Sequence, residues 1–313
     1  MRTALTTLLF GATLLTSTKA SDAGDIHKDF FRIAQDNGFD VRTHRVVTED
    51  GYILSVFRLH PYDETPSAIH PPLFFQHGLL DSADAFITGV GELAPPFVAA
   101  REGYDVWLGN SRGNKYSKEH VKLDSKDPAF WEFDWEKMGD FDIPATIDYI
   151  LSNTEFTRLT VIGHSQGTSQ MFYALSHLEE SLASKITLFI AMAPVTLMNH
   201  QTSPLVNFIA RHLSLITKTA RLLHINEFFP ANYLTTGTFR LICGTIPDLC
   251  KLFESMLFTE DTSVDNTERF SVYMGHFPSG SSIKGMLHYA QIVNARQFQR
   301  YDFGVKENMR AYS

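Results

Sequence analysis

The segment Gly163-His164-Ser165-Gln166-Gly167 has the residue types and spacing of a serine nucleophile on a tight turn. This G-x-S-x-G pattern is weak alone, but an apolar run over residues 159–162 precedes it and an amphipathic stretch follows it. A strand, a turn and a helix in that order would lift the Ser165 hydroxyl above the carboxyl end of a sheet. There the hydroxyl could attack a carbonyl carbon and form an acyl-enzyme. A plain strand–turn–helix connection is the alternative, and the flanking pattern favours the nucleophile.

Acyl transfer also requires backbone N–H groups that stabilise the oxyanion of the tetrahedral intermediate. The residue after the nucleophile, Gln166, is one candidate donor. Leu79 is the second, because it lies in the His77-Gly78-Leu79-Leu80 turn that follows a short apolar run over 72–76. An ordinary turn at the end of a strand is the alternative for this segment. The order and spacing of the two features together favour an acyl-transfer site.

The elements that would position these residues alternate along the chain. A hairpin is expected over 41–47 and 52–59, because Asp50-Gly51 joins two β-rich runs. Further strands are expected over 72–76, 104–108, 159–162 and 186–193, the last of them buried. Helices are expected over 92–101, after a cap at Asp142, and after the Ser165 turn, with Met171, Ala174, Leu175 and Leu178 on its apolar face. This alternation predicts an α/β fold, with a mostly parallel sheet covered by helices on both faces.

The pattern changes after about residue 196. Helical candidates follow over 204–216, 239–242 and 252–257, without a convincing parallel strand, and one more helix is expected over 283–298. We therefore expect four segments: a leader over 1–20, a sheet domain with its hairpin over 21–195, an inserted helical cap over 196–280, and a return to the sheet domain over 281–313.

The N-terminus and the composition indicate a globular protein of the secretory pathway. Arg2, an uncharged run over 4–15 and a Thr18-Lys19-Ala20 cleavage site are typical of a signal peptide, with a buried N-terminal helix as the alternative. The chain has 313 residues, 44% of them apolar, and a net charge of −8, so it has no basic footprint for nucleic acid. No later segment is apolar for long enough to span a bilayer. In an oxidising compartment Cys243 and Cys250 would pair, and two buried free thiols are the alternative.

Other residues with chemical potential have simpler interpretations. Arg112 follows the expected 104–108 strand and could contact a substrate, but an arginine in such a loop more often ties loops together, which we favour. The sequence has no H-E-x-x-H motif, no paired C-x-x-C motif and no glycine-rich phosphate loop. We therefore expect neither a metal nor a nucleotide cofactor.

Several longer segments resemble the acid lipase family, which includes gastric and lysosomal acid lipases and has the α/β-hydrolase fold. The matching segments are Asn37-Gly38-Phe39 and residues 48–54, 76–80, 107–114, 116–117, 142–148 and 163–168. The resemblance implies a secreted or lysosomal hydrolase of neutral lipid esters, either triacylglycerols or cholesteryl esters. It also implies an apolar acyl pocket beneath the cap and a cap disulfide between Cys243 and Cys250. A non-catalytic lipid-binding remnant and a short-chain esterase or acyltransferase remain as alternatives, and the oligomeric state is not predicted.

The family's catalytic triad is incomplete in this sequence. In α/β-hydrolases an acid and then a histidine follow the serine, but the resemblance ends at Tyr301-Asp302-Phe303-Gly304, before either family segment. Asp302 and His164 do not match triad positions. We therefore expect that the last strands of the fold are absent, that the chain is truncated and that its activity is impaired. Each later histidine is expected to have a structural or surface role: His177, His200, His212, His224, His276 and His288.

Overall fold

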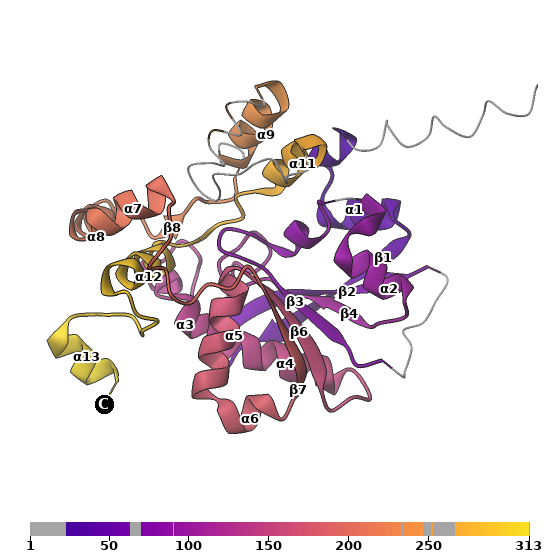
Figure 1. Ribbon diagram of the computed structural model, residues 1–313, viewed down its shortest axis with the longest axis horizontal. Helices are drawn as coiled ribbons and strands as arrows, with labels where there is room; N and C mark the ends of the chain where they lie inside the picture. Colours follow the sequence, from indigo (N-terminus) through magenta and orange to yellow (C-terminus); the bar gives the residue numbers. More distant parts are fainter. Residues whose placement is uncertain are drawn as a thin grey trace, which may run out of the picture.

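A mixed sheet forms the centre of the computed structural model, which describes residues 23–62, 70–89, 91–232, 235–246, 249, 252 and 267–312 (Figure 1). Seven strands run in the order β1-β2-β4-β3-β6-β7, with β5 paired to β2. Neighbours among β3, β4, β6 and β7 are parallel, whereas the β1–β2 hairpin is antiparallel. The predicted α/β fold is confirmed. The strands are β1 Phe39–Val47, β2 Tyr52–Pro61, β3 Leu73–Gln76, β4 Val106–Leu108, β5 Glu119–His120, β6 Leu159–His164 and β7 Ile186–Met192.

Helices cover both faces of this sheet, and the two faces have separate cores. Alternate strand residues explain the division, because Phe74 and Val161 pack under α4 and α5 while Phe75 and Ile162 pack under α1 and α2. The helices of the sheet domain are α1 Phe30–Asp36, α2 Pro95–Arg101, α3 Trp135–Lys137, α4 Ile143–Ser152, α5 Gln166–His177 and α6 Glu179–Ala183. Short 3-10 segments are η1 Ala23–His27, η2 Ala83–Phe86, η3 Gly91–Leu93 and η4 Pro128–Trp131, and η5 Met138–Asp142 is a π-helix.

The later helices, drawn in orange to yellow, gather above and to the left of the sheet in Figure 1. They are α7 Pro204–Arg211, α8 Leu213–Leu222, α9 Thr235–Thr245, α11 Thr267–His276, α12 Ile283–Ala295 and α13 Val305–Ala311, with a small ribbon of β8 Glu227–Phe228 and β9 Ser281–Ser282. The expected single helix over 204–216 is wrong, because the chain breaks at His212 and continues as α8. Most of the expected helix over 252–257, and the whole leader over 1–20, lie outside the described residues. In the described part of the chain, no helix has the length and apolar character to cross a bilayer.

Strand β7 is less buried than its sequence predicted. Leu188, Ile190 and Met192 share one face of the strand and are 52%, 42% and 42% exposed. Phe189 on the other face contacts Phe172 of α5. The expectation of a strand buried on both faces is wrong, because β7 is the edge of the described sheet and helix α5 covers only one of its faces.

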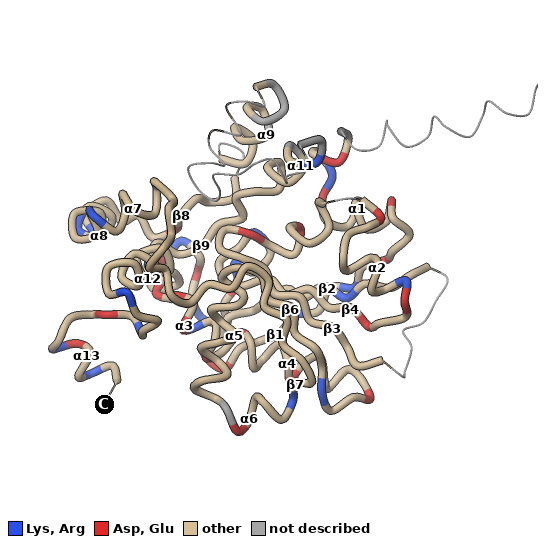
Figure 2. The backbone as a smooth tube through the Cα atoms, in the orientation of Figure 1, with Lys and Arg blue, Asp and Glu red and all other residues tan. Residues whose placement is uncertain are grey.

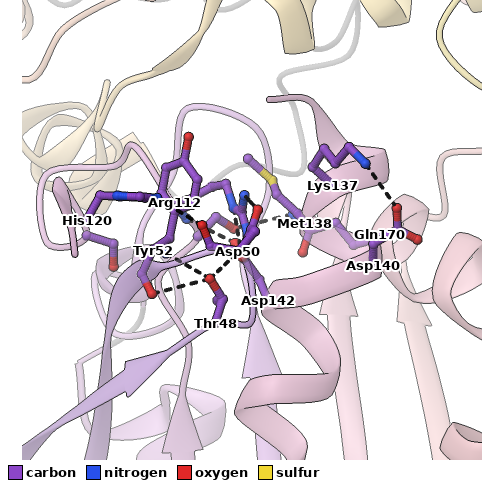
Figure 3. A network of polar contacts seen from close by, with 12 residues as sticks. Thr48, Asp50, Tyr52, Arg112, His120, Lys137, Met138, Asp140, Asp142 and Gln170 are labelled. Carbon is purple, nitrogen blue, oxygen red and sulfur yellow. Dashed lines mark hydrogen bonds and ion pairs between the residues drawn. The ribbon is translucent and has the colours of Figure 1, made fainter. Parts of the chain in front are cut away.

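Arg112 ties two loops to the sheet domain, as its sequence context predicted (Figure 3). Its guanidinium is 1% exposed, binds Asp50 at 2.5 Å and Asp142 at 2.6 Å, and lies 3.9 Å from the ring centre of Tyr52. Asp142 therefore makes no side-chain cap for α4, and that expectation is wrong. Its carboxylate is bound by Arg112, and the π-helix η5 leads directly into α4.

Candidate active site

Ser165 lies on a strained turn between β6 and α5. Its backbone has φ 50° and ψ −116°, a conformation that is uncommon and costly for a residue with a side chain. The Ser165 N–H donates to the Met192 carbonyl at 3.0 Å. A Cβ at Gly167 would lie 2.3 Å from the Gln76 carbonyl oxygen, so this glycine lets α5 begin directly against the end of β3. The sequence pattern predicted this sharp turn.

A second set of hydrogen bonds, which sequence reasoning missed, holds the turn in place. The Thr168 hydroxyl donates to the Ser165 carbonyl at 2.6 Å and accepts from the Val195 N–H at 2.9 Å. The Ser169 hydroxyl donates to the Val195 carbonyl at 2.6 Å and accepts from Tyr289 of α12 at 3.3 Å. The strained serine is therefore fixed by the segment after β7 and by a helix more than a hundred residues later.

The turn after β3 passes beside the serine. A Cβ placed on Gly78 would be only 3.1 Å from the Ser165 Cβ. Within the described chain, neither the Leu79 N–H nor the Gln166 N–H donates to a protein acceptor. Gln166 also begins α5, where the helix dipole favours negative charge. The geometry is compatible with an oxyanion hole, but the roles of Leu79 and Gln166 stay a prediction.

His77 fixes the shape of this turn as a neutral side chain. Its Nε2 accepts from the Ser111 N–H at 3.0 Å, so Nδ1–H donates to the Gly78 carbonyl at 2.8 Å. Burial lowers the pKa of His77 to about 4. An imidazole locked in one tautomer by both of its nitrogens is unsuited to proton transfer, so His77 supports the turn.

An apolar cavity opens beside Ser165. Its volume is about 150 Å³, and side chains from the turn after β3, the segment after β7, α7, β8 and α12 surround it. The lining consists of Leu79, Leu80, Ser165, Val195, Met198, Leu205, Val206, Phe228, Met286 and Tyr289. Apart from Ser165 and the Tyr289 hydroxyl, these side chains offer only apolar groups. The cavity therefore fits an aliphatic chain whose reacting end lies at Ser165.

No general base contacts the serine in the described part of the chain, where the Ser165 hydroxyl makes no hydrogen bond. His276 pairs with Asp84 at 2.6 Å, and His288 stacks on Trp135 at 4.3 Å. The other histidines that follow Ser165 are exposed at the surface, namely His177, His200, His212 and His224. Asp302 and His164, which do not match triad positions, are also engaged elsewhere. The Asp302 carboxylate accepts hydrogen bonds from Gly304 and Asn308, and the His164 ring lies beside Gly78.

A buried polar cluster behind the His77–Leu80 turn was not predicted from sequence. Asp84 accepts from Lys115 at 2.5 Å and from Tyr116 at 2.9 Å, and it pairs with His276 of α11. Although burial would raise it, the pKa of Asp84 is held well below its usual range by Lys115 and His276. The cluster fastens α11 to the turn. The sequence signal that could have revealed this cluster was the pair Asp81 and Asp84, which closely follows His77-Gly78.

Asp81, in the same cluster, gives a pH-dependent prediction. Burial raises the pKa of Asp81 to about 7, against the hydrogen bond from Tyr273 that lowers it. An aspartate in the unfolded chain has a pKa of ~3.9. Asp81 therefore lowers the free energy of unfolding as the pH rises from about 4 to about 7. We expect Asp81→Asn to leave the free energy of unfolding nearly unchanged at low pH and to raise it by about 2–4 kcal/mol above neutrality.

Urea titrations on both sides of this pH window check the prediction. Asp148→Asn is a matched control, because Asp148 is 55% exposed and pairs only at the surface with Lys185, so its replacement should change the free energy of unfolding little at either pH. If Asp81→Asn gave the same change in stability at both pH values, Asp81 would not be protonated preferentially in the folded protein.

Cys250 lies outside the described residues, as do the side-chain contacts of Cys243, so their pairing stays a prediction.

Asp134, Glu136 and His288 bring three possible metal ligands within 4.8 Å of one another. Both Glu136 oxygens already accept hydrogen bonds, from Arg300 at 2.6 Å and from the Tyr301 N–H at 3.0 Å. Because Arg300 already balances the Glu136 charge, this buried group suits an ion pair better than a divalent cation.

Comparisons with known proteins agree with this geometry. A family profile described as a partial alpha/beta-hydrolase lipase region matches residues 30–90, and the alpha/beta hydrolase fold matches residues 71–302. Human lipase member K is 37% identical over 275 residues, which are 85% of this chain and 67% of that protein. Mouse gastric triacylglycerol lipase is 37% identical over 284 residues, 88% of this chain and 70% of that protein. Lipase lipl-3 of Caenorhabditis elegans is 33% identical over 320 residues, 100% of this chain and 79% of that protein.

Proposed function

This chain belongs to the acid lipase family of α/β hydrolases, and we propose from that premise that Ser165 hydrolyses fatty acyl esters of neutral lipids. One observation supports the proposal above all: Ser165 lies on a strained turn at an apolar cavity, beside two N–H groups without protein acceptors. Triacylglycerols and cholesteryl esters are the substrate classes that we propose. A protein of this kind would use the secretory pathway, to which the predicted leader would direct it.

The proposed chemistry proceeds through an acyl-enzyme. The Ser165 oxygen attacks the ester carbonyl carbon, and the carbonyl oxygen becomes an oxyanion between the N–H groups of Leu79 and Gln166. The Ser165 hydroxyl gives up its proton to solvent in this attack. Collapse of the intermediate breaks the ester bond, and the leaving alkoxide takes up one proton from solvent and departs as the alcohol. Water then attacks the acyl carbonyl, releases the fatty acid and restores the Ser165 hydroxyl. Throughout, the acyl chain would occupy the cavity between Leu205, Val206 and the turn.

We also propose that these 313 residues catalyse the reaction slowly. In the described part of the chain no imidazole contacts the Ser165 hydroxyl, so nothing there accepts its proton. In subtilisin, loss of the catalytic histidine alone costs about 10⁶ in turnover and leaves about 10³–10⁴ over the uncatalysed rate. Binding in the cavity and the oxyanion hole alone would supply a residual rate of that order, and an acyl-enzyme formed at Ser165 would add to it.

Ester hydrolysis measured on a chain-length series tests the proposal. We expect slow release of fatty acid from long-chain p-nitrophenyl esters and triolein, with longer acyl chains preferred because they fill the apolar cavity. Ser165→Ala should lower this rate to the level that binding and the oxyanion hole supply without a nucleophile. Ser176→Ala, on the exposed side of the same helix, should leave it unchanged.

Other results would favour the other functions. Preference for acetyl or butyryl esters would indicate a short-chain esterase, and transfer to an added alcohol in preference to water would indicate an acyltransferase. Fatty acid binding without any Ser165-dependent hydrolysis would indicate a lipid-binding protein. A turnover equal to that of a serine hydrolase with a complete triad would contradict the proposed impairment.

A further inference from the structure

The turn after β3 places a buried carboxyl group beside Ser165. Gly78 has no side chain, and a Cβ built there would lie 3.1 Å from the Ser165 Cβ and 3.3 Å from the Asp81 Oδ2. These two atoms are therefore separated by no more than the sum of the two distances. The His164 Nδ1 borders the same point, also at 3.3 Å. One hydrogen-bonded water can bridge a span of this size between the serine hydroxyl and the carboxyl group.

The Asp81 carboxyl group has one oxygen that is held and one that can accept from a water. Oδ1 accepts from the Tyr273 hydroxyl of α11 at 3.1 Å, whereas no N–H or side chain of the described chain donates to Oδ2. The Asp81 N–H donates to the Gly78 carbonyl at 3.3 Å, so Asp81 is fixed to the same turn as Leu79. Asp81 is 6% exposed, and its carboxyl group therefore lies in a largely dry environment.

The elements on either side of Ser165 supply no carboxylate of their own. β6 and α5 contain no aspartate, glutamate, lysine or arginine, and Figure 2 shows both in tan. A carboxylate that takes the serine proton must therefore come from another segment. Burial lowers the pKa of His164 and raises the pKa of Asp81 to about 7, so the Asp81 carboxylate is the stronger base of the two groups beside Gly78.

We propose that the Asp81 carboxylate accepts the Ser165 proton through one intervening water. No described side chain receives this proton by direct contact, and the water provides the connection. As the Ser165 oxygen bonds to the ester carbonyl carbon, its proton passes to the water and the water gives a proton to Asp81 Oδ2. When the ester C–O bond breaks, the reverse transfer protonates the alkoxide and restores the carboxylate. The inference rests on the proposed function and specifies the solvent molecule that takes part in it.

The charges around Asp81 give this carboxylate a suitable strength. Burial and, to a smaller extent, Asp84 of η2 raise the pKa of Asp81, while Tyr273 of α11 and Lys115 of the loop after β4 lower it. His276 of α11 pairs with Asp84. A general base is most effective when its pKa lies near the working pH, and about 7 meets that condition for a protein that works near neutrality.

The pH dependence of Ser165 labelling by a long-chain fluorophosphonate tests the proposal. The quantity compared is the labelling rate of the unchanged protein divided by that of Asp81→Asn, from about pH 5 to about pH 9. We expect a ratio near one at the acidic end, where Asp81 is protonated, and a ratio of about 10–100 at the alkaline end. The midpoint should lie near pH 7. Because Asp81→Asn is expected to be more stable above neutrality, slower labelling there cannot come from a loss of folding.

Two further variants complete the test. Tyr273→Phe removes the hydrogen bond that lowers the Asp81 pKa, so the rise of its labelling rate should have a midpoint at higher pH than in the unchanged protein. Asp148→Asn, at a position that is 55% exposed, should label as the unchanged protein does at every pH.

Several results would overturn the proposal. They are a ratio for Asp81→Asn that stays constant across the pH range, a ratio near one above neutrality, or an unchanged midpoint in Tyr273→Phe. Absence of any labelling at Ser165 would contradict the proposed function itself. Labelling that is lost in Ser165→Ala but does not depend on Asp81 would contradict only the proton transfer to Asp81.

Discussion

Replacing Arg112 with methionine is expected to lower the free energy of unfolding by about 3–5 kcal/mol. Arg112 is 1% exposed and bridges Asp50 and Asp142, of which Asp142 is also buried, at 4% exposed. The substitution keeps most of the side-chain volume but leaves the Asp142 carboxylate without a cation in the protein interior. The cost of an uncompensated buried charge exceeds the net contribution of the intact ion pair, so the effect is large.

The Arg112→Met substitution should also alter the geometry of the candidate site. The loop that begins at Arg112 is preceded by Ser111, whose N–H fixes the His77 tautomer and so the shape of the His77–Leu80 turn. Urea titration checks the loss of stability. Arg45→Gln is the matched control, because Arg45 and Glu119 are both 57% exposed and an exposed ion pair contributes little to stability. Equal effects of the two substitutions would show that the Arg112 network does not stabilise the fold.

Gly167→Ala is expected to destabilise the protein by about 3 kcal/mol and to displace Ser165. The new Cβ would lie 2.3 Å from the Gln76 carbonyl oxygen and 2.9 Å from that of His77. Both atoms belong to the backbone of β3 and its following turn, so no flexible side chain can move aside. The first turn of α5 would have to shift away from the sheet, and the serine with it.

Thermal unfolding and Ser165 labelling together check this second prediction. Gly89→Ala is the matched control, since no atom lies within 4 Å of a Cβ at Gly89 and a change within about 0.5 kcal/mol is expected there. A Gly167→Ala protein with unchanged melting temperature and unchanged labelling would show that α5 does not start as close to β3 as described.

The sequence predicted those elements in which local pattern and long-range packing agree. The Asp50-Gly51 hairpin forms with Val47 opposite Ile53, and the apolar run before Ser165 is a central strand. The pattern failed where a distant partner decides the outcome. Asp142 has the residue type of a helix cap, but the guanidinium of Arg112 binds it. An apolar sequence such as β7 indicates a strand without revealing whether a helix covers its second face.

In the candidate site, too, the features set by local motifs were predicted and those set by distant contacts were not. The Ser165 turn and the His77–Leu80 turn follow from short motifs, because a strained turn requires particular residues at fixed spacing. The supports of the site could not be predicted, since Thr168, Tyr289 and the Asp84–His276 pair act through contacts between remote segments. The cavity likewise depends on side chains from six separate parts of the chain.

The central claim is that Ser165 is the nucleophile, and covalent labelling tests it most directly. The folded protein would be incubated with a long-chain fluorophosphonate, and the modified peptide would be identified by mass spectrometry. We predict slow labelling confined to Ser165, lost in Ser165→Ala and retained in Ser176→Ala. Labelling of another residue, or none after prolonged incubation with folded protein, would contradict the account.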